Sequence, residues 1–218
     1  MWPNEPAEYR KARNKLLKAE AKLRAQAEAV ANMRRQLPKG GAAKENYVFT
    51  DVAIGKPVRL SELFTGGRKS LFLYNFMLAP GQTPCPMCTS LLDALDGEAV
   101  HLGERINLAA VAKASPSEIA DFAKKRGWKN LKFLSSGANS YNRDYGGESE
   151  AGNQLPMMHV WVKHGGKTQH FWASELFGYG DPGWKHHPRH ADAIWPLWNL
   201  LDLTPESRGM NWYPKLAY

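Results

Sequence analysis

The stretch from Leu71 to Leu95, LFLYNFMLAPGQTPCPMCTSLLDAL, decides the fold of this 218-residue chain. It begins with a continuous apolar run, which is typical of a strand that is buried on both faces of a sheet. A short loop follows, and Cys85-Pro86-Met87-Cys88 then opens a segment with the leucine spacing of a helix. Because proline suits the first position of a helix, the predicted order is strand, loop, cysteine pair and helix.

Cys85 and Cys88 are the only cysteines in the sequence. Two cysteines placed at random would fall at this spacing in roughly one chain in a hundred, so the pair calls for an explanation. At the start of a helix, the unpaired backbone N–H groups and the positive end of the helix dipole favour a thiolate at Cys85. Cys88, one turn inside the helix, would attack a mixed disulfide formed at Cys85 and release the reduced product. Cys85 and Cys88 are therefore candidate catalytic residues for thiol-disulfide exchange.

Other uses of the cysteine pair fit the sequence less well. A structural zinc site needs four ligands. The candidates to complete the cysteine pair are His186, His187 and His190, which lie in a predicted surface loop. A c-type haem is excluded, because Thr89 stands where the attachment motif requires histidine. We therefore expect no metal and no cofactor. His159, inside an apolar run, is expected to be a hydrogen-bonded core or edge residue rather than a base.

Composition restricts the class of protein. No run approaches the roughly 18 apolar residues of a membrane span. The first ten residues are polar and charged, without the apolar centre of a secretory signal. We therefore expect a cytoplasmic protein without membrane contact, in which a close cysteine pair is more often catalytic or metal-binding than a structural disulfide.

Seven of the eight net positive charges belong to residues 1–44, which hold eleven Lys/Arg against four Asp/Glu, whereas the remaining residues hold eighteen against seventeen. This segment is predicted to be one long basic helix from about Pro6 to Leu37, ended by the linker PKGG at 38–41. It lacks interleaved aromatic or glycine-rich motifs, so we do not expect nucleic acid as a partner. Its apolar residues recur at strict sevenfold spacing: Tyr9, Leu16, Leu23, Val30 and Leu37. Such a narrow stripe favours a coiled-coil seam and a homodimer through this helix.

From residue 45 the chain is predicted to form one α/β domain of alternating short strands and helices. The polar, glycine-rich stretch 135–154 is expected to be a binding loop or lid. Strands are expected at 47–49, within 55–64, and at 70–78, 106–113, 131–134, 157–162 and 168–172, and helices at 86–102, from Ser115 to Gly127 and at 192–203.

Four stretches of the sequence carry a resemblance to a known family. They are YVFTDVAIGKPVRLSELF, LFLYNFMLAPGQTPCPMCTSLLDALDG, RINLAAVAKASPSEIADFAKKRGW and WNLLDLTPESRG. The domain resembles the thioredoxin-like superfamily, and nearly the whole chain is similar to the DUF899 family of predicted dithiol-disulfide oxidoreductases. The resemblance implies a three-layer fold, a central mixed sheet flanked by helices, after the basic N-terminal helix. It also implies a redox-active Cys85/Cys88 pair, with a protein disulfide or a small oxidant as substrate and a thiol as electron donor.

The resemblance further implies a cis-proline beside the cysteine pair, at Leu155-Pro156, where the preceding backbone pairs with an extended substrate. The alternative is an ordinary trans proline at the start of an edge strand. We expect Leu155 and Pro156 to bind substrate, together with the residues that flank the cysteines, Thr83, Pro84 and Pro86.

The sequence departs from the well-known relatives of the superfamily around the cysteines. Thioredoxins carry Trp before the pair and Gly-Pro within it, where this chain has Pro84 and Pro86-Met87. Pro-x is closer to glutaredoxin, although no glutathione-binding signature is evident. Pro80 and Thr83 form only a contracted version of the peroxiredoxin pattern. A peroxiredoxin-like peroxidase and a non-enzymatic binding or scaffold protein therefore stand as alternatives.

Overall fold

The computed structural model describes residues 2–38, 40–177, 189–209 and 212–218, in two compact units that divide after residue 39. The first unit contains the helix α1 (Ala7–Arg35), which confirms the long N-terminal helix. None of the residues 7–35 is buried. Among the described residues, no helix combines the length and the apolar character that crossing a membrane requires.

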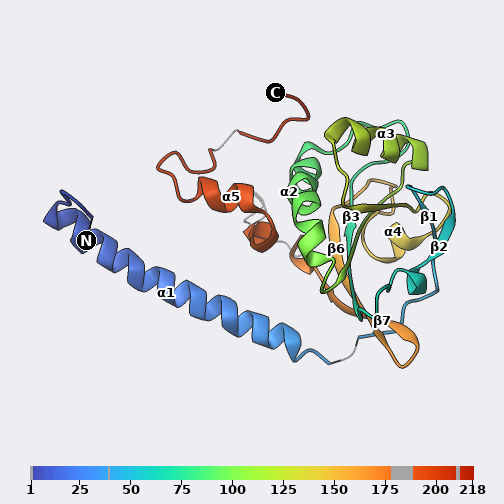
Figure 1. Ribbon diagram of the computed structural model, residues 1–218, viewed down its shortest axis with the longest axis horizontal. Coiled ribbons are helices and arrows are strands. Elements are labelled where there is room, and N and C mark those ends of the chain that lie inside the picture. The colour runs from blue at the N-terminus through green and yellow to red at the C-terminus, as the bar shows by residue number, and fades with distance from the viewer. Residues whose placement is uncertain (1, 39, 178–188, 210–211) are drawn as a thin grey trace. The chain divides into compact units, whose positions relative to one another are not determined.

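The second unit is built on a mixed seven-stranded sheet with the order β2-β1-β5-β4-β3-β6-β7 (Figure 1). Strands β3, β4 and β5 run parallel at its centre, and the other neighbouring pairs are antiparallel. This is the mixed sheet that the sequence predicts. The strands are β1 (Val48–Asp51), β2 (Pro57–Arg59), β3 (Ser70–Asn75), β4 (Asn107–Ala112), β5 (Lys132–Ser135), β6 (Met157–His164) and β7 (Lys167–Ala173).

Two apolar clusters lie on the two faces of this sheet. Leu73 and Tyr74, adjacent in β3, fall in different clusters because successive side chains of a strand point to opposite faces. The Tyr74 cluster includes side chains of the helices α2 (Pro86–Leu102), α3 (Pro116–Arg126) and α5 (Pro196–Leu201). The Leu73 cluster is closed by shorter elements, the 3-10 helix η1 (Leu60–Glu62) and the helix α4 (Tyr141–Asp144). The cysteine-bearing helix thus packs on the side with the larger helices.

The predicted last helix, 192–203, is shorter in the structure. A 3-10 helix, η4 (Arg189–Ile194), is followed by α5, which begins at Pro196. Proline has no N–H to donate within a helix, so it starts a new one instead of lying inside a longer one.

The stretch 135–154, where the sequence predicts a binding loop or lid, is partly packed into the fold, and its role in binding stays a prediction. It contains α4, and Asn142 and Gln154 are buried. The Ser136 hydroxyl donates to Asn142 Oδ1 at 2.8 Å, and Asn142 Nδ2 donates to Gln154 Oε1 at 3.1 Å. These polar side chains satisfy one another inside the protein, so their polarity does not indicate exposure to solvent.

The segment that follows α1 covers the outer edge of β7. Ala42 forms an isolated antiparallel bridge with Gln169. The Ala43 N–H donates to the Thr168 carbonyl, and the His170 N–H donates to the Gly41 carbonyl, both at 2.9 Å. Backbone groups of Thr168 and His170, which an edge strand would otherwise expose, are therefore paired within the chain.

A buried carboxylate fixes α2 to the loop between α3 and β5. Asp96 accepts hydrogen bonds from the backbone N–H groups of Lys129 at 3.0 Å, Asn130 at 2.9 Å and Leu131 at 2.9 Å. The helix that carries the cysteines is thereby tied to the central sheet through its middle turn.

Replacing Asp96 by alanine should lower the free energy of unfolding by about 2–4 kcal/mol, because it leaves these backbone donors without an acceptor. Urea denaturation followed by circular dichroism measures the change. Glu98, exposed on the same helix, provides the control, and Glu98→Ala should cost less than about 0.5 kcal/mol. Equal effects of the two variants would contradict the anchoring role of Asp96.

Candidate functional site

Cys85 and Cys88 lie together at the start of α2, as the sequence predicts. Cys85 is the N-cap residue with an extended backbone, φ −65° and ψ 122°, and Pro86 is the first helical residue. The Cys88 N–H donates to Cys85 Sγ at 3.4 Å. Both cysteines are free thiols. Cys85 is half-buried, whereas Cys88 is 2% exposed, so only the first sulfur is open to a substrate.

The backbone of Met77 holds both cysteines. Its carbonyl accepts from the Cys85 N–H at 3.2 Å, and its N–H is hydrogen-bonded to the Cys88 sulfur. Thr89, which is buried in the next helical position, donates its hydroxyl to the Cys85 carbonyl at 2.9 Å. The residues after β3 therefore return to the start of α2 and fix the pair against the carboxyl end of that strand.

The start of α3 holds the loop that precedes Cys85. Ser115 and Glu118 form a capping box, in which the Ser115 N–H donates to Glu118 Oε2 at 2.9 Å. The other carboxylate oxygen of Glu118 accepts from the Gly81 N–H at 2.7 Å. These bonds, the Ser115 hydroxyl first, lower the pKa of Glu118. One carboxylate thus caps a helix and positions the loop before Cys85.

The surroundings of the two sulfurs separate their pKa values. The pKa of Cys85 is lowered to about 6, first by a hydrogen bond from the Cys88 thiol and then, against the opposing effect of burial, by the backbone N–H groups of Cys88 and Met87. Burial, followed by the neighbouring Cys85, raises the pKa of Cys88 well above its usual range. At neutral pH the accessible sulfur is a thiolate and the buried one a thiol.

Tyr74 is a site residue that sequence reasoning missed. It is buried in β3, and its hydroxyl forms a hydrogen bond with the Cys88 sulfur. Burial raises the pKa of Tyr74 well above its usual range, so the phenol stays neutral and can donate that bond. The alternation of side chains along β3 places Tyr74 on the face of the sheet that α2 covers. In a continuous apolar run, however, a tyrosine at that position is expected to be an ordinary core residue.

The remaining predicted site residues lie around the same end of β3. Thr83 and Pro84, which directly precede Cys85 in the chain, line a cavity. Leu155 and Pro156 precede Met157, which is paired with Asn75, the last residue of β3. All peptide bonds between described residues are trans, so the expected cis bond before Pro156 is wrong. The Leu155 N–H donates to the Gly147 carbonyl at 2.9 Å, and this bond guides the trans chain into β6.

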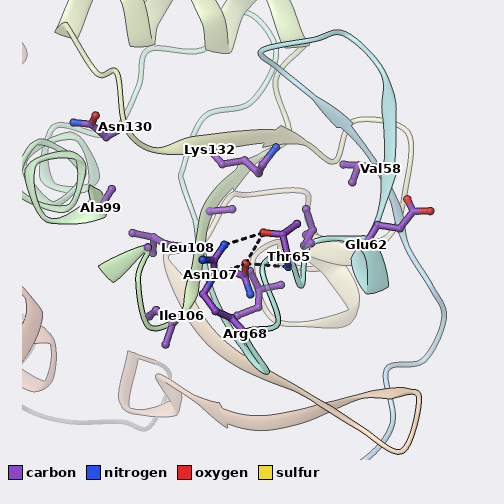
Figure 2. A pocket seen from close by; sticks show the side chains of 14 residues that line it. Val58, Glu62, Thr65, Arg68, Ala99, Ile106, Asn107, Leu108, Asn130 and Lys132 are labelled. Atoms are coloured by element: carbon purple, nitrogen blue, oxygen red, sulfur yellow. Dashed lines mark hydrogen bonds between the residues drawn. The ribbon is translucent and has the colours of Figure 1, made fainter. Parts of the chain in front are cut away.

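A second pocket lies at the opposite end of the sheet, near the start of β4 (Figure 2). Asn107 Oδ1 accepts from the Thr65 N–H at 3.1 Å, the Thr65 hydroxyl at 3.0 Å and Arg68 Nε at 3.3 Å. The polar groups there are used to join the β2–β3 connection to β4. Because these polar groups are engaged with one another, we assign the pocket a structural role.

His159 is a hydrogen-bonded core residue, as expected. Its Nδ1 lies 3.1 Å from His170 Nε2, and its Nε2 lies 2.8 Å from the Tyr145 carbonyl oxygen. Burial lowers the pKa of His159 to about 4. Within the described part of the chain, no three His, Cys, Asp or Glu side chains gather in a way that could hold a metal ion. His186 and His187 lie outside the described residues, and of His190 only the backbone, in η4, is described.

The fold is shared with solved structures of low sequence identity. The peroxiredoxin Q of Xanthomonas campestris has a TM-score of 0.50 at 15% identity, covering 74% of this chain and 96% of its own. The peroxidoxin BcpB of Mycobacterium tuberculosis gives 0.49 at 18%, with coverages of 74% and 96%. The exposed lipoprotein thioredoxin Etrx1 of Streptococcus pneumoniae gives 0.42 at 21%, with coverages of 57% and 87%. At these identities the likeness concerns the fold alone, which is thioredoxin-like.

Among curated proteins, no sequence matches the chain significantly. A family model does match, over residues 3–218, and its description is "Bacterial protein of unknown function (DUF899)". With the thioredoxin-like sheet, the long helix α1 and the cysteine pair at the start of α2 established, the chain belongs to the DUF899 family.

Proposed function

We propose that the protein is a thiol-disulfide oxidoreductase that cycles Cys85 and Cys88 between the dithiol and the disulfide. The observation that carries this proposal is the pairing of a half-buried Cys85, with its pKa lowered to about 6, with a buried Cys88 one helical turn away, whose pKa is raised. Such a pair supplies an attacking thiolate and a resolving thiol in one rigid element.

The proposed reaction has two exchange steps. The Cys85 thiolate attacks one sulfur of a substrate disulfide, the substrate S–S bond breaks, and the first substrate thiolate leaves and takes a proton from solvent. Cys88 then gives up its proton, and its thiolate attacks Cys85 Sγ, forming the Cys85–Cys88 disulfide and releasing the second substrate thiolate. Two electrons pass to the substrate, and a thiol donor returns the pair to the dithiol by the reverse exchange.

The surroundings of Cys88 favour the second step only after the first. While Cys85 is a thiolate, its charge raises the pKa of Cys88. In the mixed disulfide that charge is gone, and the Tyr74 hydroxyl still donates to the Cys88 sulfur and favours its ionised form. The resolving thiol is therefore activated when a substrate is attached to its partner.

A peroxidase is the second candidate, because the fold resembles that of peroxiredoxin Q. Cys85 would be oxidised by a hydroperoxide to a sulfenic acid, and Cys88 would condense with it, releasing water and forming the same disulfide. Consumption of a hydroperoxide, compared with consumption of a disulfide by the same preparation, separates the two candidates.

Cys85→Ser should lose disulfide reduction by on the order of 1000-fold, because no nucleophile remains at the helix start. Cys88→Ser should instead stop after the first step and accumulate one substrate thiol bound to Cys85. Reaction with hydroxyethyl disulfide, followed by mass spectrometry of the intact protein, measures both outcomes. Full activity in Cys85→Ser, or no trapped adduct in Cys88→Ser, would contradict the proposed roles.

The alkylation rate of Cys85 should rise about tenfold between pH 5 and pH 7 and then level off, because the thiolate fraction follows a pKa of about 6. Iodoacetamide labelling with peptide mass spectrometry measures this profile for each cysteine. Cys88→Ala should raise the pH midpoint of Cys85 alkylation, because it removes the hydrogen bond that contributes most to stabilising the Cys85 thiolate. Cys88→Ser should raise this midpoint less, because the serine hydroxyl still donates a hydrogen bond to Cys85. A wild-type midpoint near pH 8 would exclude the activated thiolate.

A further inference from the structure

A cavity of about 420 Å³ lies beside the loop that leads to Cys85. One wall is the loop Gly81–Pro84, and the other comes from α3 and the C-terminal segment. The side chains of Phe122 and Pro84 make part of the wall apolar, while Gln82 and Thr83 provide hydrogen-bonding groups. The lining residues beyond the loop are Phe122, Lys125, Arg126 and Leu216.

The two cations of this cavity differ in their partners. Arg126 is ion-paired with Asp93 of α2, and its Nη1 donates to the Leu216 carbonyl at 2.9 Å. Lys125 forms no ion pair with any acidic side chain of the described residues, and Asp121, one turn before it on α3, does not line the cavity. The cavity wall therefore carries one uncompensated positive charge.

We propose that this cavity binds the carboxylate-bearing part of a substrate whose disulfide is attacked by Cys85. The inference rests on the proposed oxidoreductase function and names its substrate class, an acidic disulfide. Because Pro84 directly precedes Cys85, the cavity begins one residue from the nucleophile; Phe122 and Pro84 would contact the carbon chain of the substrate, and Lys125 would attract its carboxylate. A partly exposed charge pair of this kind improves binding or the association rate by a few-fold and weakens with salt.

Two small disulfides that differ in charge test the subsite: dithiodipropionate, which carries carboxylates, and hydroxyethyl disulfide, which is neutral. Lys125→Gln should lower the second-order rate constant for the dicarboxylate by about threefold, and Lys125→Glu by about tenfold, with little change for the neutral disulfide. Raising the salt concentration should narrow the difference between the wild type and the variants.

Lys124→Gln is the matched control, because Lys124 belongs to the same turn of α3 but lines a different cavity. Equal effects of Lys124→Gln and Lys125→Gln, or an equal effect of Lys125→Gln on both disulfides, would overturn the subsite. Neither result would affect the oxidoreductase proposal, which depends on the Cys85 and Cys88 variants.

A separate observation concerns α1, whose apolar seam is open to solvent. Leu23 is 71% and Met33 67% exposed, and Tyr9, Leu16 and Leu37 are also exposed. A row of large apolar side chains along one helix marks an interaction surface. Taking Tyr9, Leu16, Leu23, Val30 and Leu37 as heptad positions a, the d positions are Ala12, Ala19, Gln26 and Met33.

The charges that flank this seam match a second copy in parallel orientation. In a parallel pair, each g residue faces the e residue five positions later on the partner. Glu8 then faces Arg13, and Lys15 faces Glu20, two pairs of opposite charge. Within one chain Arg13 and Glu20 pair with each other at 2.8 Å on the helix surface, a weak interaction that can be exchanged for these contacts. The antiparallel alignment that overlaps the whole seam places Arg13 opposite Arg34.

We infer that α1 forms a parallel two-stranded coiled coil with a second copy of this chain. The seam would bury the apolar a and d residues of both copies, and the g–e pairs would select the orientation. Because both helices then end on the same side, the two linkers after residue 37 leave the coiled coil together.

Sedimentation equilibrium tests this inference by comparing the full chain with variants in which the charges beside the seam are reversed. Glu20→Lys should weaken the dimer by about tenfold or more, because Lys15 then faces a like charge on both sides of the seam, and Lys15→Glu should weaken it similarly. The double variant Lys15→Glu/Glu20→Lys should restore the dimer. Glu28→Lys, the same charge change at an outward f position, should have no effect.

A monomeric wild type at about 100 μM, or a double variant no tighter than the single ones, would overturn the parallel coiled coil. Circular dichroism of each variant checks that α1 is still helical.

Discussion

The hydrogen bond between the two thiols is the interaction on which the proposed chemistry depends. It links a sulfur near solvent to one that is almost fully buried, and it is the largest contribution to the lowered pKa of Cys85. The same neighbourhood raises the pKa of Cys88. Geometry at a single helix start therefore assigns different protonation states, and so different chemical roles, to two residues of the same type.

The rest of the fold serves to hold this helix start in place. Met77 contributes one backbone donor and one backbone acceptor to the pair, Glu118 fixes the preceding loop, and Asp96 secures α2 from its far side. The Met77 and Glu118 contacts gather around the carboxyl ends of the parallel strands, where loops are free to vary while the sheet stays rigid, whereas the Asp96 contacts lie before the start of β5. The two cysteines are thus held in a fixed position, although several of the residues around them lie in a loop.

Capping and helix-ending residues in the sequence correctly predicted where α2 begins and where α3 begins and ends. Pro86 marks the start of a helix whose bounds match the prediction, and Ser115 and Gly127 mark the two ends of α3, with Gly127 at φ +79°. Signals that depend on tertiary packing were read less well. Within the polar stretch 135–154, Ser136, Asn142 and Gln154 are buried and linked by hydrogen bonds, and the family resemblance suggested a cis bond before Pro156 that the structure does not have. Tyr74 could not be separated from packing residues, because its role depends on a sulfur that comes near only after folding.

The covered edge of β7 also limits how a protein substrate can approach. An extended peptide joins a sheet only along a strand whose backbone groups are unpaired. Residues 41–43 already occupy one side of the sheet, and the other side ends in β2, three residues long and beginning with Pro57. Strand addition is thus blocked along residues 168–170, and under the proposed function we expect a macromolecular disulfide to reach Cys85 on a projecting turn rather than as an added strand.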